Sequence, residues 1–442
     1  MPRLRMLDLR GDDRDPRPLL VRPSVDGAAV RDAVATTIAA VRSRGDAALT
    51  ELTARHDRVA LGPDELLVPR DVIEAAVASL PPDLHAAIDR AADQVRWFHE
   101  RCRPLDWEER RDGALMGVRH HAVSRAGVYV PGGKAVYPST VVMTVVPAQV
   151  AGVGEIVLCT PPTGRDASGA RDGWPDRTIL AAAGLLGVDR VVRVGGAQAI
   201  AAMALGTRRV PRCDVVVGPG NVHVSVAKQL LVAEGAIGSD GYAGPTEIAI
   251  IADDTADPRI VAADLVAQAE HDELASVLLI TTAPGLVAAV EEALELEVAA
   301  THHRERVEAA LAGQGMVALV DDLDRAIEVA EAFAAEHLEV HVRRAAATAA
   351  RVRYAGTVFV GSDTPVSLGD YAAGPNHTLP TSGTARFRGG LSTSTFLVPV
   401  NHVEYDAASL AELAPSVRAL ATAEDLPAHW RAVEVRLAED GG

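Results

Sequence analysis

Aromatic residues, long apolar runs and a secretory leader are all scarce or missing in this sequence. Phe, Trp and Tyr make up 3% of its 442 residues, while 48% of the residues are hydrophobic, so Ala, Val and Leu must supply most of the core. No run of about 20 apolar residues is free of charge, which argues against a membrane-spanning helix. Residues 1–18 contain no apolar core, so we expect no signal peptide and a cytoplasmic protein.

Cysteine and positive charge are also limited. Cys102, Cys159 and Cys213 are scattered without C-x-x-C spacing, which predicts neither a disulfide framework nor a thiolate zinc site. The net charge of −17 argues against binding along a nucleic-acid backbone. It leaves open a small anionic ligand held by main-chain N–H groups. The histidines are then the main metal-capable residues, although most are expected on the surface or in packing.

Short apolar segments that alternate with helical patterns predict an α/β fold with two doubly wound, Rossmann-like units. Residues 27–101 are periodic in Ala, Val and Leu and predict helices. Alternating strands and helices follow from Gly127 and again from Thr246, a pattern typical of buried parallel sheets with right-handed crossovers. After residue 390 the pattern loosens into one strand-like and one helical stretch, which predicts an extension rather than an independent domain.

Two constellations of metal-capable residues stand out locally. Gln268 and His271 are three apart in a helix predicted from Pro258 to about residue 274, so they share a helical face. Asp370 and His377 flank a Gly/Pro turn after a predicted strand, where α/β proteins build sites. On local sequence alone, an exposed helix face and an Asx-turn explain these residues as well. His429, five residues after Glu424, lies in a predicted C-terminal helix and is by itself an ordinary helical histidine.

Glu336 and His337 are neighbours in the apolar stretch "AAEHLEV". Adjacent side chains do not share a face of a helix or strand. The pair is therefore either an exposed helix end or two separate proton-transfer groups aimed at one substrate.

Two glycine-bearing turns, "VGGAQAI" and "VGPGNVH", each follow a predicted strand and open a helix. Helix-start N–H groups and the helix dipole can hold phosphate. Neither turn is the G-x-G-x-x-G fingerprint, so these turns alone do not establish a dinucleotide site.

Taken together, several motifs resemble the histidinol dehydrogenase family. They are "GVYVPGGKAVYPSTVVM", "VGGAQAI", "GPGN", "AGPTE", "AQAEHD", "AEHLE", "GDYAAGPNHTLPT" and "LATAEDLPAH". The resemblance implies a homodimer with one Zn²⁺ per subunit, which oxidises L-histidinol to L-histidine through L-histidinaldehyde with NAD⁺. It implies no nucleic-acid or membrane partner. The expected domains are an N-terminal segment (1–26), a main catalytic domain (27–128 with 241–390), an inserted nucleotide-binding domain (129–240) and a tail that swaps between subunits (391–442).

The resemblance also assigns roles to particular residues. The zinc ligands fall on Gln268, His271, Asp370 and the partner subunit's His429. The acid/base pair falls on Glu336 and His337. Substrate contacts fall on the zinc ligands, His337, Thr246, His377 and Glu424. Nucleotide contacts fall on Tyr129, Gln198 and Asn221.

Three other functions have to be weighed against this expectation. A zinc hydrolase would also use a metal, a Glu and a His, but it leaves the first α/β series unexplained. A binding protein would show affinity without turnover. A dehydrogenase of the same fold could oxidise another amino- or sulfo-alcohol, because Thr246 stands where many relatives have Ser and Pro375 where they often have Thr or Ser.

Overall fold

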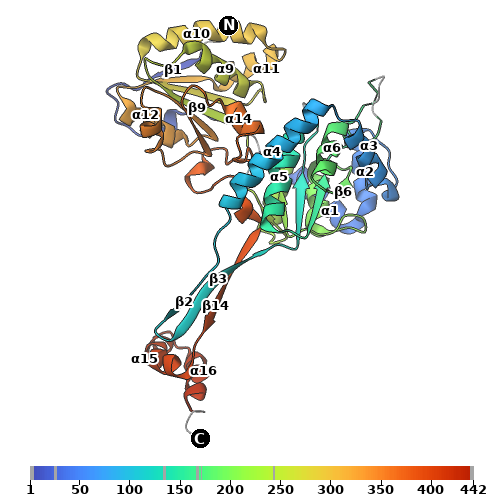
Figure 1. Ribbon diagram of the computed structural model, residues 1–442, viewed down its shortest axis with the longest axis vertical. Helices are drawn as coiled ribbons and strands as arrows, with labels where there is room; N and C mark the ends of the chain where they lie inside the picture. Colours follow the sequence, from blue (N-terminus) through green and yellow to red (C-terminus); the bar gives the residue numbers. More distant parts are fainter. Residues whose placement is uncertain are drawn as a thin grey trace. The chain divides into compact units, whose positions relative to one another are not determined.

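The structure is a computed structural model that describes residues 4–23, 27–132, 136–165, 169–170, 172–241 and 244–438. The chain divides into two compact units (Figure 1). The first contains residues 1–102 and 124–396, and the second contains residues 103–123 and 397–442.

One sheet of the first unit has five parallel strands in the order β6-β5-β4-β7-β8. The chain therefore enters near the centre and winds outwards in both directions, as in a doubly wound fold. The strands are β4 (Arg125–Tyr129), β5 (Glu155–Cys159), β6 (Arg190–Val192), β7 (Val215–Val217) and β8 (Gly238–Ser239). The helices between them are α5 (Pro138–Ala151), α6 (Arg177–Leu185), α7 (Gly196–Leu205) and α8 (Val222–Ala233).

The predicted N-terminal helices pack on this five-stranded part. They are α1 (Gly27–Arg44), α2 (Asp46–Asp57), α3 (Arg70–Ala78) and α4 (Pro82–Arg101). Helix α1 contacts α7 and α8, α3 contacts α6, and α4 lies along α5 (Figure 1). Val34, Ile38 and Val41 recur on one face of α1 and share a core with Ile200 and Leu231. The domain boundaries at residues 129 and 240 stay a prediction. The main contacts of these helices are with the five-stranded part, and Gln94 and Phe98 of α4 also lie against Gly374.

His99, near the end of α4, makes the stability of this part dependent on pH. Its side chain is buried, and neither ring nitrogen has a hydrogen-bond partner among the described residues. Burial lowers its pKa from 6.5 to about 4. The fold thus favours the neutral ring. The contribution of His99 to the free energy of unfolding is therefore complete above pH 6.5 and is lost as the pH falls towards 4.

We therefore expect His99→Phe, which cannot take up a proton, to lose less stability in acid than the unsubstituted chain. The difference between the two proteins in the loss of unfolding free energy from pH 7 to pH 4 should be about 3 kcal/mol. Urea unfolding at the two pH values measures it. Equal acid losses in the two proteins would show that His99 does not carry this penalty.

The other sheet of the first unit has six parallel strands in the order β1-β11-β10-β9-β12-β13. The strands are β1 (Arg5–Asp8), β9 (Glu247–Ala252), β10 (Ser276–Thr281), β11 (Met316–Leu319), β12 (His337–His341) and β13 (Thr357–Val360). The helices are α9 (Pro258–Ala269), α10 (Pro284–Ala300), α11 (Arg304–Gln314), α12 (Leu323–Phe333), α13 (Ala345–Ala349) and α14 (Val366–Tyr371). Every residue of β9, β10 and β12 is buried, as expected for parallel strands covered on both faces.

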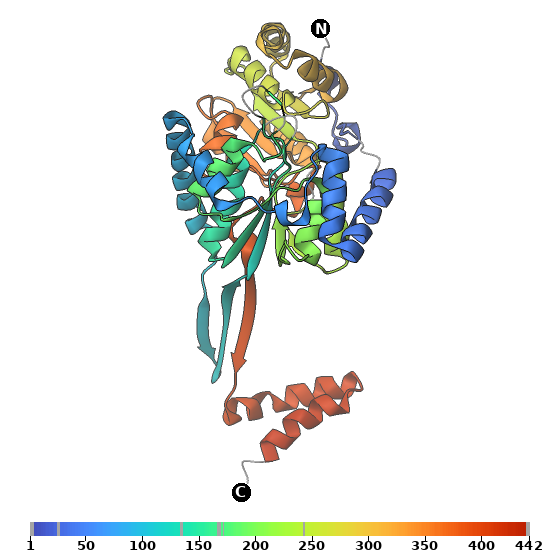
Figure 2. The ribbon, with the colours of Figure 1, turned by 90° about the vertical axis from the view of Figure 1, so that its right-hand side faces the viewer.

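The second unit is an antiparallel sheet followed by two helices that pack on each other, drawn in red in Figure 2. The sheet order is β14-β3-β2. The elements are β2 (Trp107–Arg111), β3 (Ala114–Ala122), β14 (Leu397–Glu404), α15 (Ala407–Ala423) and α16 (Pro427–Ala438). Asp112 and Gly113 both have positive φ, the requirement of a tight type I′ hairpin turn.

The predicted α/β class with two doubly wound units is confirmed. The exchange of the tail between subunits stays a prediction. In the part of the chain that the structure describes, no helix is both long enough and apolar enough to cross a membrane.

Candidate active site

Most of the predicted site residues gather at the amino ends of β9 and β12, which are neighbours in the six-stranded sheet. Thr246 directly precedes β9, Glu336 directly precedes β12, and His337 is paired with Ile248. This differs from the sequence expectation of a site at the carboxyl ends of the strands. The difference arises because α9 runs back along the sheet and its C-terminal end brings Gln268 to Thr246.

Glu336 receives two hydrogen bonds on the same carboxylate oxygen. The Thr246 hydroxyl donates to Oε2 at 2.5 Å, and the main-chain N–H of Glu247 donates to it at 3.0 Å. Burial raises the pKa of Glu336 to about 8, although both hydrogen bonds act in the opposite direction. Once it has lost its proton, this carboxylate is a stronger base than an ordinary one, which suits proton transfer.

His337 offers one free ring nitrogen. Its Nδ1 lies 3.2 Å from the carbonyl oxygen of Glu247, which can only accept, so Nδ1 carries the proton. Its Nε2 is buried without a hydrogen-bond partner among the described residues and lies 4.0 Å from Oδ1 of Asp370. Burial lowers the pKa of His337, with Asp370 opposing it. The neutral ring with a bare Nε2 is the form that a general base requires.

The neighbouring side chains of Glu336 and His337 come closer than strand alternation predicts. Nδ1 of His337 lies 3.6 Å from Oε2 of Glu336. Alternation does not govern Glu336, because the residue precedes the strand. The pair is buried, so an exposed helix end is excluded.

Gln268, His271 and Asp370 supply the donor atoms of a candidate metal centre. Gln268 Nε2 donates to the Thr246 hydroxyl at 2.5 Å, while its Oε1 is buried without a partner among the residues described. His271 Nδ1 lies 3.1 Å from the Ala267 carbonyl oxygen, so Nε2 keeps its lone pair, and Nε2 lies 3.9 Å from Asp370 Oδ2. Two ligands of one zinc ion, each at about 2.0–2.2 Å, lie no more than about 4.4 Å apart. His271 and Asp370 are therefore close enough to bind one zinc ion, and the unpartnered Oε1 of Gln268 is a further donor of the type that zinc accepts.

One local prediction in this region was wrong. Helix α9 ends at Ala269 rather than near residue 274, so His271 lies in the following turn rather than on the helical face. Asp370 lies near the end of the short helix α14, directly before the predicted Gly/Pro turn. The residues still converge, because α14 contacts α9.

His377 connects the two sheets of the first unit. Its Nδ1 lies 3.0 Å from the main-chain oxygen of Asp370, and its Nε2 lies 3.4 Å from the hydroxyl of Thr140 on α5. Burial lowers its pKa. A neutral, partly buried ring beside Asp370 is suited to contact a polar substrate, and its substrate role stays a prediction.

Glu424 and His429 belong to the second unit. Glu424 caps the C-terminal end of α15, and His429 lies in the first turn of α16. Both side chains are exposed. Their contribution to the site of a partner subunit stays a prediction.

The predicted nucleotide residues lie in the five-stranded part. The hydroxyl of Tyr129, at the end of β4, accepts a hydrogen bond from Gly196 N at 3.0 Å, and burial raises its pKa to about 12. Gln198 is buried in the first turn of α7. Asn221 caps α8 and accepts from the N–H groups of His223 and Val224. Because these contacts engage some helix-start N–H groups, a phosphate would find fewer free donors there than the sequence suggested.

A second polar cluster, formed by Asp264, Glu339 and His341, was missed from the sequence. All three are buried, with one ligand atom of each within 4.8 Å of the others. Glu339 accepts from Val366 N at 2.8 Å on one oxygen and lies 3.0 Å from His341 Nε2 with the other. Burial and Glu339 raise the pKa of Asp264 to about 7. The spacing of 337, 339 and 341 on one strand face was the available signal. The direct contact between Glu339 and His341 favours proton sharing between these two residues. The three ligand atoms also lie close enough together to hold a metal ion.

Known proteins match the chain along its whole length. A sequence model described as histidinol dehydrogenase matches residues 20–437. Histidinol dehydrogenase of Thermobifida fusca (strain YX) is 49% identical over 98% of this chain and 97% of its own. That of Mycobacterium tuberculosis (strain ATCC 25618 / H37Rv) is 47% identical over 98% of both chains. The crystal structure of histidinol dehydrogenase from Elizabethkingia anophelis superimposes with a TM-score of 0.94 at 31% identity, covering both chains fully.

The chain combines a doubly wound sheet with glycine-bearing helix starts and a second sheet with a buried, adjacent Glu and His. Together with these matches, the fold identifies the chain as an α/β oxidoreductase. It belongs to the histidinol dehydrogenase family.

Proposed function

We propose that this chain is a zinc-dependent, NAD-linked enzyme that oxidises L-histidinol to L-histidine through L-histidinaldehyde. The observation that carries the proposal is the buried ring of His337 at the amino ends of β9 and β12. Its bare Nε2 lies 4.0 Å from Asp370, and its Nδ1 lies 3.6 Å from Glu336. The overall reaction takes histidinol, two NAD⁺ and one water to histidine, two NADH and three protons. The proposal includes a cytoplasmic homodimer in which the partner subunit's His429 completes the zinc site.

The first oxidation needs a base for the hydroxyl proton as hydride leaves for the nicotinamide. His337 Nε2 is suited to this role, because its Nδ1–H is held by the Glu247 carbonyl and the ring cannot present the other tautomer without losing that bond. The second oxidation needs water added to the aldehyde. Glu336 is suited to activate this water, because its raised pKa makes its carboxylate a good proton acceptor.

Gln268, His271 and Asp370 would hold zinc through Oε1, Nε2 and a carboxylate oxygen. An N/O donor set without thiolate leaves room for further N/O ligands from a substrate. When bound, zinc would hold the imidazole and amine of histidinol and so orient its alcohol. Thr246, which receives a hydrogen bond from Gln268 and donates one to Glu336, couples this donor set to the acid/base pair.

A test of the proposal is the formation of NADH on mixing the protein with histidinol and NAD⁺. We expect two NADH for each histidinol consumed, with histidine as the product, because the aldehyde is oxidised on the same protein. A panel of amino- and sulfo-alcohols, assayed in parallel, checks the substrate. Faster NADH formation with another alcohol would overturn the substrate assignment, and cleavage of an amide without NADH would indicate the zinc hydrolase instead.

A further inference from the structure

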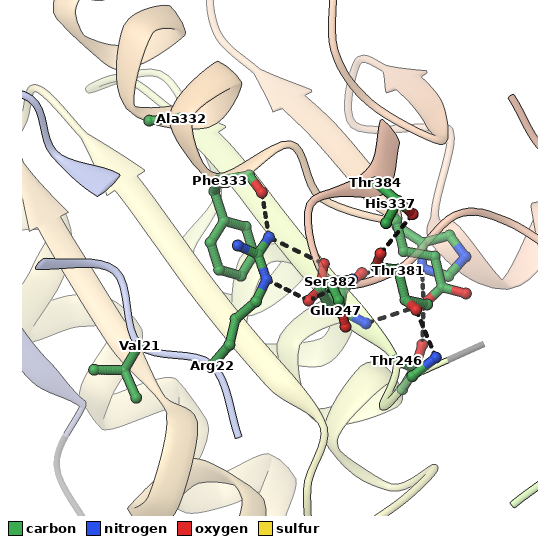
Figure 3. A network of polar contacts seen from close by, with 12 residues as sticks. Val21, Arg22, Thr246, Glu247, Ala332, Phe333, His337, Thr381, Ser382 and Thr384 are labelled. Atoms are coloured by element: carbon green, nitrogen blue, oxygen red, sulfur yellow. Dashed lines mark hydrogen bonds and ion pairs between the residues drawn. The ribbon is translucent and has the colours of Figure 1, made fainter. Parts of the chain in front are cut away.

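An ion pair between the partly buried Arg22 and the buried Glu247 lies beside His337 (Figure 3). Arg22 Nε donates to Glu247 Oε1 at 2.6 Å, and Nη2 donates to Oε2 at 3.2 Å. The side chain of Glu247 is 2% exposed and that of Arg22 is 23% exposed. The main-chain N–H of Ser382 also donates to Oε1, at 3.1 Å. Both oxygens of this buried carboxylate are therefore occupied.

Arg22 also holds the C-terminal end of α12. Its Nη2 donates to the main-chain oxygen of Phe333, and its guanidinium lies over the Phe333 ring, 4.0 Å from the centroid (Figure 3). Phe333 is the last residue of α12 and precedes Glu336 by three positions. Arg22 thus ties the segment that leads into Glu336 and His337 to the start of β9.

The main chain of Glu247 contacts both proton-transfer residues. Its N–H donates to Glu336 Oε2, and its carbonyl oxygen accepts from His337 Nδ1. The first contact sets the direction of the Glu336 carboxylate. The second decides which ring nitrogen of His337 lacks a proton. The placement of the main chain at this one residue therefore affects both groups.

A buried ion pair is a costly way to stabilise a strand end. Its desolvation penalty often equals or exceeds its Coulombic gain, and apolar residues of similar size commonly do as well. The pair does have a local consequence that apolar residues could not reproduce. Arg22 bonds both carboxylate oxygens of Glu247 and the Phe333 carbonyl, and Ser382 N–H bonds the same carboxylate. These directional bonds hold the start of β9 in one position.

We propose that Arg22 and Glu247 are positioning residues for the proton-transfer steps. They hold the start of β9 so that its N–H orients the Glu336 carboxylate and its C=O keeps His337 with a bare Nε2. The inference rests on the proposed function, because Arg22 and Glu247 would act through Glu336 and His337, the two residues to which that function assigns proton transfer.

The main test is Arg22→Met, combined with Glu336→Gln in a double-mutant cycle. Misplacement of a reacting group by an ångström can cost about 10²-fold in rate. We expect Arg22→Met to lower kcat for histidinaldehyde oxidation on that order, with little change in the KM for NAD⁺. In the Glu336→Gln background the same substitution should cost less, because one of the two groups through which Arg22 acts is already lost.

A matched control is Arg353→Met. Arg353 pairs with Glu331, a buried residue of α12. Its loss also deprives a buried carboxylate of its arginine, but this carboxylate has no direct contact with Glu336 or His337. We expect it to reduce stability but not kcat. Arg22→Lys keeps the charge without the paired geometry, and it takes the place of Arg22→Met in the cycle if Arg22→Met does not fold. Equal rate losses in the Arg22 and Arg353 variants, or costs that simply add in the cycle, would overturn the proposal.

A second readout does not depend on turnover. In protein labelled with ¹⁵N-histidine, the His337 signals are those lost in His337→Asn. We expect a ring protonated at Nδ1 and bare at Nε2, and a mixture of tautomers in Arg22→Met. If the unsubstituted chain forms no NADH from histidinol but Arg22→Met still changes the His337 tautomer, the proposed function fails while the positioning role stands. If the unsubstituted chain is active and the His337 tautomer is the same in Arg22→Met, the positioning role alone is overturned.

Discussion

His337→Asn is expected to slow both oxidations by about 10²–10⁴-fold, the usual loss when a placed general base is removed, while zinc stays bound. The Asn amide can still donate to the Glu247 carbonyl in place of Nδ1, so the local fold should survive. It has no group that accepts a proton as Nε2 does. Single-turnover NADH formation from histidinol and from histidinaldehyde, with zinc content measured on the same sample, checks the prediction.

Glu336→Gln is the informative partner of that substitution. Gln keeps an oxygen that can accept from Thr246 and Glu247, but it cannot activate water. We expect aldehyde oxidation to fall by more than alcohol oxidation, because only the second step adds water. Equal losses in the two steps would show that the roles are not divided between Glu336 and His337.

The sequence predicts the buried strands well and the exposed ones poorly. Segments such as 156–159 and 277–280 are apolar throughout, because both faces of their sheets are covered. β1 is a four-residue edge strand with three exposed residues, and β2 is fully exposed. Neither carries an apolar pattern, so pairing with β11 and β3 decides their structure. Such pairing depends on residues far away in the sequence, which the local hydrophobic periodicity of a segment does not reveal.

The candidate site shows the same division. Spacing drew attention to Gln268, His271 and Asp370, and the family resemblance supplied their roles. Nothing in the sequence placed Thr246 between Gln268 and Glu336, because that contact depends on where α9 ends against the sheet. The part played by the Glu247 main chain was equally hidden, since main-chain groups leave no mark on residue identity. The buried acids Asp264, on α9, and Glu339, on β12, likewise come together only through the packing of the helix on the sheet.

Removal of the metal is expected to abolish turnover while leaving NAD⁺ affinity largely intact. The predicted ligands Gln268, His271 and Asp370 belong to the six-stranded part. Tyr129 and Asn221, the predicted nucleotide contacts, belong to the five-stranded part. The chain should therefore lose the means of orienting its substrate without losing the surface that binds the nucleotide. Calorimetric titration with NAD⁺ before and after chelation measures the second half of this prediction, and NADH formation measures the first.

Asp370→Asn and Asp363→Asn provide a matched pair for the same question. Asp370 lies in α14 with one oxygen 3.9 Å from His271 Nε2, while Asp363 is exposed in the turn before that helix. Loss of the Asp370 charge removes an anionic ligand that a divalent ion favours, so zinc content after dialysis should fall for Asp370→Asn and stay unchanged for Asp363→Asn. Full zinc content in Asp370→Asn would contradict the ligand assignment, and loss of NAD⁺ binding together with the metal would contradict the separation of the two sites.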